Sequence, residues 1–161
     1  MKPALVVYFS RTGYTRRVAE QIALAAGADC EPIRERSART GFLGYWRSAR
    51  EALRKSAIDI EPASANPRDY ALVVLGTPVW AGNIASPVRA YIAAHKPELG
   101  RIALFCTQGG SGGDKVLRRM ADLCGRSPIA SACFNDAEID RGLLGEKVQG
   151  FVATLAEQKA A

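Results

Sequence analysis

A chain of 161 residues is long enough for one domain that buries roughly two-thirds of its unfolded surface, and too short for two domains of ordinary size. An apolar fraction of 48% with 24% charged residues excludes an intrinsically disordered chain, and no apolar run is long enough to span a membrane. The opening apolar run is too short for a signal peptide and Arg11 interrupts it. We therefore expect one cytoplasmic domain over residues 1–161.

Short apolar runs and helical patterns alternate along the chain. The runs cover residues 4–9, 70–75, 102–106 and 129–134, with a weaker one at 30–33. They are continuous, which is typical of parallel strands covered on both faces. Gly27 is placed to end the first helix, Ser86 with Pro87 to begin a later one, and the carboxylate of Asp114 to cap another. This alternation predicts an α/β fold with a doubly wound parallel sheet.

The cysteines and the single histidine form no metal or redox motif. The cysteines contain no C-x-x-C pair; they are Cys30, Cys106, Cys124 and Cys133. We expect them to be small buried residues in a reducing compartment, and His95 to lie at a helix end. No metal site is predicted.

Three loops form the candidate ligand site, because ligands of an open parallel sheet bind beyond the carboxyl ends of its strands. They cover residues 10–15, 76–83 and 107–113. The first supplies three hydroxyls, a glycine and the free amides of a helix N-terminus, which suit a phosphate. From these residues alone, a Ser/Thr-rich helix cap is the alternative. The glycine fingerprints of dinucleotide and nucleotide loops are missing from the sequence, so a terminal monophosphate fits best.

Two of these loops resemble those of the flavodoxin-like FMN proteins. Residues 10–15 (SRTGYT) look like their [ST]-x-T-G-x-T phosphate loop, and residues 76–83 (GTPVWAGN) look like their second flavin loop. Together with the strand pattern, the resemblance covers nearly the whole chain. It implies FMN as the cofactor, bound to a three-layer fold whose five parallel strands have the order 2-1-3-4-5.

The resemblance also implies which residues meet FMN, and it assigns none of them a catalytic acid or base role. The phosphate would be held by the hydroxyls and amides of Ser10, Arg11, Thr12, Gly13, Tyr14 and Thr15. The flavin ring, with Trp80 against it, would meet the group Pro78, Val79, Trp80, Ala81, Gly82 and Asn83. The pyrimidine end would meet Thr107, Gln108, Gly109 and Gly110. For Trp80 the alternative is a loop tryptophan packed on the sheet edge.

The third loop departs from the electron carriers that the chain resembles, because residues 107–113 contain no aromatic side chain and no carboxylate. One flavin face would then be open to a nicotinamide donor or an organic acceptor. We therefore expect an FMN-dependent oxidoreductase that takes electrons from NAD(P)H and passes them to a quinone or a similar small acceptor. A flavodoxin-type electron carrier between proteins is the alternative.

A basic segment over residues 34–55 contains seven basic and two acidic residues, a net charge of +5. Apolar residues at helical spacing predict an amphipathic helix over residues 42–55, with Arg47, Arg50 and Arg54 on another face. These arginines would either face water or attract an acidic redox protein, a nicotinamide dinucleotide or an anionic membrane surface. No nucleic-acid motif accompanies the charge. The oligomeric state stays open, with a homodimer among the options.

Overall fold

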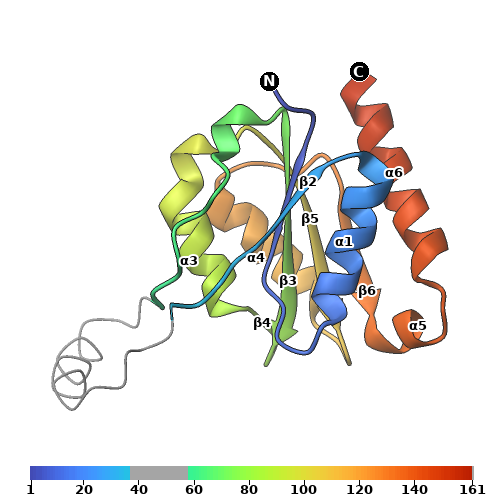
Figure 1. Cartoon of the computed structure of the whole chain (residues 1–161). Helices are drawn as coiled ribbons and strands as arrows, with labels where there is room; N and C mark the ends of the chain where they lie inside the picture. The colour runs from blue at the N-terminus through green and yellow to red at the C-terminus, as the bar shows by residue number, and fades with distance from the viewer. Residues whose placement is uncertain (37–57, 161) are drawn as a thin grey trace, which may run out of the picture.

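The computed structural model describes residues 1–36 and 58–160. The predicted amphipathic helix and its arginines Arg47, Arg50 and Arg54 lie outside the described residues. Figure 1 shows three layers, with a central sheet covered by helices on both faces. Residues 61–66 contain no helix or strand.

The elements alternate as predicted. The strands are β1 (Leu5–Tyr8), β2 (Asp29–Pro32), β3 (Leu72–Trp80), β4 (Asn83–Ile84), β5 (Arg101–Gln108) and β6 (Ser131–Asn135). The helices are α1 (Tyr14–Ala26), α3 (Ser86–His95), α4 (Gly113–Cys124), α5 (Asp136–Asp140) and α6 (Leu144–Ala160). Short 3-10 turns cover Pro67–Asp69 and Lys96–Glu98.

The sheet has the strand order β2-β1-β3-β5-β6, and these neighbours are all parallel. Numbered among themselves along the chain, the five parallel strands give the expected order 2-1-3-4-5. The predicted fold is therefore confirmed. The sequence did not predict β4, a two-residue strand that pairs antiparallel with the end of β3.

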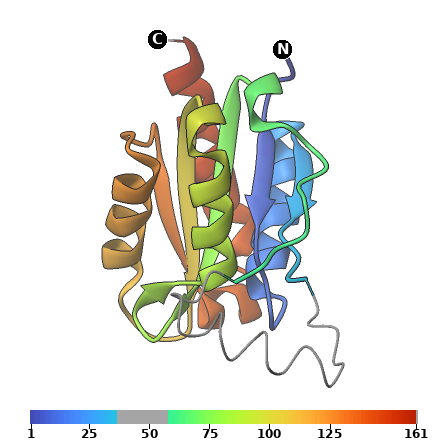
Figure 2. The same cartoon turned by 90° about the vertical axis from the view of Figure 1, so that its left-hand side faces the viewer.

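Both faces of the sheet are buried, which explains why the strands are apolar without alternation. Leu5 and Val7 of β1 pack in the cluster that includes residues of α3 and α4. Val6 and Tyr8 point the other way, into the cluster that includes residues of α1 and α6. Figure 2 shows α3 and α4 side by side on their face of the sheet.

Three helix boundaries test the capping predictions. Gly27 ends α1 in the left-handed conformation, with φ of 60°, as expected. Ser86 is the first residue of α3 rather than its cap, because Ala85 takes the cap position and no side chain bonds there. Asp114 lies in the first turn of α4, whose cap is Gly112. His95 ends α3, as predicted.

The prediction that the cysteines are buried is correct for only some of them. Cys106 and Cys124 are buried, whereas Cys133 is half-buried. Cys30 is exposed, so the expectation of a buried residue was wrong there. It lies on β2, which is the outermost strand and has mostly exposed residues.

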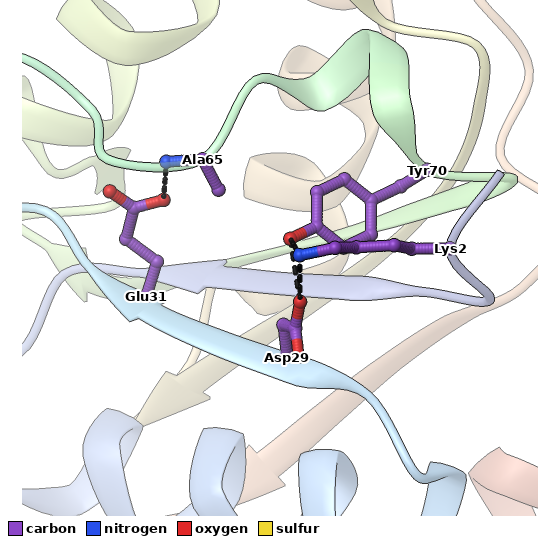
Figure 3. Close-up of polar contacts among 5 residues, drawn as sticks. All are labelled: Lys2, Asp29, Glu31, Ala65 and Tyr70. Atoms are coloured by element: carbon purple, nitrogen blue, oxygen red, sulfur yellow. Dashed lines mark hydrogen bonds and ion pairs between the residues drawn. The ribbon is translucent and has the colours of Figure 1, made fainter.

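Polar contacts hold β2 at the edge of the sheet (Figure 3). The Tyr70 hydroxyl donates to Oδ2 of Asp29 at 2.6 Å, and Nζ of Lys2 lies 3.0 Å from the same oxygen. Further along β2, the carboxylate of Glu31 accepts a hydrogen bond from the amide of Ala65, which Figure 3 shows. It accepts another from the amide of Ser64. These contacts join β2 to the chain segment that leads into β3. They hold β2 in place although its mostly exposed residues provide little apolar packing.

Candidate functional site

The three predicted loops converge beyond the carboxyl ends of β1, β3 and β5. In Figure 1 this is the lower end of the sheet, opposite both chain termini. Thr15, in the first turn of α1, and Thr107, near the end of β5, are joined by a hydrogen bond of 2.8 Å between their hydroxyls. A Cβ added at Gly112 would lie 3.6 Å from Cα of Gly82, so the third loop also meets the end of β3.

The first loop offers free backbone amides to an anion. Gly13 precedes α1 with φ of 100°, and its own amide donates to Oγ of Ser10 at 3.2 Å. The hydrogen bond from the amide of Arg17 to the carbonyl of Gly13 is the first backbone hydrogen bond of the helix. The amides of residues 14–16 therefore have no partner within the helix. No acidic side chain occupies the first turn and no side chain caps it, which leaves a positive field at this end.

The hydroxyl side chains of this loop differ in their surroundings. Thr15 is buried and is already bonded to Thr107, so it fixes the position of the helix start. Thr12 is exposed and Ser10 is half-buried. These two hydroxyls, with the helix amides, are the groups of the predicted phosphate loop that an anion can reach.

Tyr14 turns its side chain away from the predicted phosphate position. Its hydroxyl donates to Oδ2 of Asp140 on α5 at 2.7 Å. This hydrogen bond raises the pKa of Tyr14 above its usual value. Of Tyr14, only the backbone amide is therefore available to bind a phosphate. Its side chain joins α1 to α5 instead.

The second loop was expected to cover residues 76–83, but most of it is strand. β3 continues to Trp80, which pairs with Asn83 of β4 across a two-residue turn. Ala81 and Gly82 form that turn with φ of 46° and 71°. Two left-handed residues in succession are the geometry of a tight hairpin turn, and it suits the twist of the strands. The expectation of a loop around Trp80 was therefore wrong.

A buried hydroxyl that the sequence analysis did not single out holds this hairpin against α3. The Thr77 hydroxyl donates to the carbonyl of Pro78 at 2.9 Å and accepts from the amide of Ala85 at 3.0 Å. Asn83 in turn accepts a hydrogen bond from Arg119 of α4. The end of β3 is thus fixed by both helices on its side of the sheet.

Trp80 is half-buried between two side chains from the segment that follows β1. The ring of Phe9 meets it edge-on, with 5.3 Å between the centroids. The guanidinium of Arg11 lies over the Trp80 ring, 4.2 Å from its centroid. This cation–π contact adds an attraction between the first and second loops. The sequence predicted Arg11 only as an amide donor, because the contact depends on how the two strand ends meet.

The shape of the third loop is set by Gln108. Its Oε1 accepts from the amide of Gly113 at 2.8 Å, and its Nε2 donates to Oδ1 of Asn135 at 2.9 Å. Gly109 and Gly110, which follow it, are exposed. The side chain of Gln108 is therefore structural, and the backbone of the two glycines is the part that a ligand can reach.

A carboxylate lies beside this loop, although the loop sequence has none up to residue 113. Asp136, at the start of α5, has Oδ2 only 3.3 Å from the position of a Cβ added at Gly109. Its Oδ1 is buried and has no hydrogen-bond partner among the described residues. Burial, and then the nearby Asp140, raise the pKa of Asp136. The third loop itself contains no carboxylate, but Asp136 places one beside it, two positions after the end of the strand predicted at residues 129–134.

The fold and the converging loops define an α/β protein of the flavodoxin type. The model of the flavodoxin family matches residues 3–149, and the chain belongs to this family. No curated protein sequence matches it.

Three solved structures illustrate the similarity in fold. A flavoprotein from Lactobacillus acidophilus, solved in complex with FMN, is 22% identical with a TM-score of 0.67, over 88% of this chain and 98% of that one. A WrbA-like flavodoxin from Agrobacterium tumefaciens is 17% identical with a TM-score of 0.60, over 99% of both chains. A two-electron reduced flavodoxin from Megasphaera elsdenii is 22% identical with a TM-score of 0.54, over 91% of this chain and 98% of that one.

The part of the chain that the structure covers contains neither a helix suited to span a membrane nor a candidate metal site. None of its helices combines the length and the apolar character that a membrane span needs. Within residues 1–36 and 58–160, no three His, Cys, Asp or Glu side chains come together as a candidate metal site.

Proposed function

We propose that the chain binds FMN at the three converging loops and uses it to pass electrons from NAD(P)H to a quinone or a similar small acceptor. When bound, FMN supplies reversible one- or two-electron chemistry, while the protein binds and orients it. The observation that carries the proposal is the start of α1, where uncapped amides stand beside Ser10 and Thr12 with no acidic residue in the first turn. This is the environment that a phosphate dianion requires.

The other two loops provide a suitable place for the flavin ring. Nothing lies within 4 Å of a Cβ added at Gly13, Gly82 or Gly110, so the backbone at these points faces open space. Trp80 supplies an aromatic surface between these loops, and Arg11 supplies a positive charge next to it. In the proposed complex, the backbone of Gly82 and of Gly109 would hold the polar edge of the flavin ring.

The third loop favours an enzyme over a carrier. Residues 109–112 bring no aromatic ring over the site, and Gly109, Gly110 and Ser111 are exposed. A second planar molecule can therefore approach the flavin from this side. The second candidate function is an electron carrier between proteins. Exposed Arg11, at the mouth of the site, favours it because an acidic partner could bind there.

Replacing Thr12 by valine tests the phosphate assignment. The substitution keeps the side-chain shape and removes one hydrogen bond to a charged group, a loss of about 1.5–3 kcal/mol or roughly a ten- to hundredfold weaker affinity. FMN affinity is measured by the quenching of flavin fluorescence. Thr154→Val, on the exposed side of α6, is the matched control and should bind like the wild type. Unchanged affinity in Thr12→Val contradicts the assignment.

Rapid mixing separates the two candidate functions. The FMN-loaded protein is mixed with NADH or NADPH in the absence of oxygen and of any reductase, and flavin absorbance is followed. Rapid bleaching, followed by recovery on addition of a soluble quinone, supports the oxidoreductase. Bleaching that requires an added reductase protein supports the carrier.

A further inference from the structure

Two cysteines that are far apart in the sequence lie side by side beneath the third loop. Cys106 on β5 and Cys133 on β6 are direct partners in the register of these parallel strands. Neighbouring strands lie about 4.8 Å apart, which is within the Cα separation of about 4.4–6.8 Å that a disulfide spans. Both side chains belong to the cluster on the α3 and α4 side of the sheet, so they point in the same direction.

The two sulfur atoms meet at the start of α4. A Cβ added at Gly113 would lie within 3.0 Å of Sγ of both Cys106 and Cys133, so both sulfurs border one small volume. The lack of a side chain at Gly113 is what leaves room for the pair. The amide of this glycine is held by Gln108, so the thiols lie directly below the third loop.

The two thiols differ in exposure and in acidity. Cys106 is fully buried, whereas Cys133 lies on the edge strand β6 and keeps part of its surface exposed. A hydrogen bond from the thiol of Cys106 lowers the pKa of Cys133, with a smaller contribution from Lys147. The same hydrogen bond, with burial, raises the pKa of Cys106. A more accessible and more acidic thiol beside a buried one is the arrangement of an attacking and a resolving cysteine.

We propose that Cys106 and Cys133 are a redox-active thiol pair that closes to an intramolecular disulfide by exchange with a small-molecule disulfide. The thiolate of Cys133 attacks one sulfur of the small disulfide and releases its first thiol. The sulfur of Cys106 then attacks Cys133, forms the Cys106–Cys133 bond and releases the second thiol. The two cysteines lose two electrons and two protons, which reduce the small disulfide to two thiols. The pair does not depend on FMN binding.

The test uses the full chain and glutathione disulfide as the oxidant. The folded protein is treated with an excess of the oxidant, remaining thiols are alkylated, and the protein is digested and analysed by mass spectrometry. The expected product has two alkylation sites fewer, and one cross-linked peptide pair that contains Cys106 and Cys133. A reductant should restore both alkylation sites.

Variants separate this pair from the other two cysteines. The double variant Cys30→Ser with Cys124→Ser keeps the pair and should still form one disulfide per molecule. Cys106→Ser should accumulate glutathione on Cys133, and Cys133→Ser should leave Cys106 unmodified. If a serine variant does not fold, the peptide map of the wild type still decides. Two intact thiols in the treated wild type, or glutathione that stays on Cys133 without a cross-link to Cys106, would overturn the proposal.

Discussion

Gly76 shows how one residue in a strand can depend on a single neighbour. A Cβ added there would come closer than 3.0 Å to three carbon atoms of the Phe105 ring. That ring is fully buried and packs edge-on against Phe134, with 6.1 Å between the centroids, so it has little room to move. The glycine is therefore required by packing, although glycine is a poor strand residue.

Gly76→Ala should lower the free energy of unfolding by about 1–3 kcal/mol, the usual cost of forcing extra atoms into a packed core. Urea unfolding measures the change. Gly100→Ala is the matched control, because nothing lies within 4 Å of the Cβ it would add, and its effect should stay within about 0.5 kcal/mol. Equal effects of the two substitutions would contradict the packing argument.

The stability of the fold should also depend on the hydrogen bond between Thr15 and Thr107, because each buried hydroxyl is the partner of the other. Replacing either by valine leaves one buried hydroxyl unpaired, which should cost about 1–3 kcal/mol. Replacing both removes the unpaired group, so the double variant should lose less than the sum of the single losses. Unfolding free energies of the four proteins form a double-mutant cycle. Additive losses would show that the bond is not formed.

The hairpin of β3 and β4 is an element whose turn residue is not ideal. Ala81 has φ of 46°, and left-handed backbone costs a residue with a Cβ about 1–2 kcal/mol. Ala81→Asn should raise the free energy of unfolding by up to about 1 kcal/mol, because Asn-Gly is the preferred pair for such a turn. Gly82→Ala should have the opposite effect. Thermal unfolding distinguishes the two, and a loss of stability in Ala81→Asn would argue against this turn geometry.

The edge strand β2 should respond to acid through Asp29. Hydrogen bonds from Tyr70 and Lys2 lower the pKa of Asp29 below its usual value. A lowered folded-state pKa gives stability that is present above the unfolded pKa of about 3.9 and is lost as the pH falls through the folded value. The wild type should therefore unfold at a higher temperature than Asp29→Asn at neutral pH, and the gap should close below about pH 4. Asp122→Asn, at an exposed position of α4, is the control. A gap that persists in acid would contradict the assignment.

The elements also show what can be predicted from sequence. Continuous apolar runs predicted the parallel strands β1, β3, β5 and β6, whereas the mostly exposed edge strand β2 left only a weak pattern. The apolar run ends before β3 does, because Gly76 and Pro78 are weak strand residues. Pairing with β5 keeps this part of the chain extended. The strand therefore extends five residues further than its apolar run, to Trp80, and β4 is too short to leave a pattern.

The candidate site also has one part that the sequence predicts and another that it does not. The phosphate loop is predicted from a local motif, because a helix start and its hydroxyls are neighbours in the sequence. The contact between Arg11 and Trp80, the approach of Asp136 to Gly109 and the pairing of Cys106 with Cys133 depend on strand order and register. No spacing within the sequence encodes them, so only the folded chain brings these residues together.

At the scale of the whole molecule, the proposed cofactor should stabilise the fold by mass action. FMN at about a hundredfold above its dissociation constant adds about 2.7 kcal/mol, which is roughly 5–10 °C in the midpoint of thermal unfolding. Riboflavin has the same ring without the phosphate and should shift the midpoint much less at the same concentration. Equal shifts from both compounds would show that the start of α1 does not bind the phosphate.

The two ends of the chain leave the molecule on the side away from the three loops (Figure 1). A fluorescent reporter, an affinity tag or a thiol for attachment to a gold electrode can therefore be joined at either end without covering the mouth of the site. Anchored in this way, the molecules would present their loops to the solution, so electrochemistry on a surface would sample the face that soluble donors and acceptors approach.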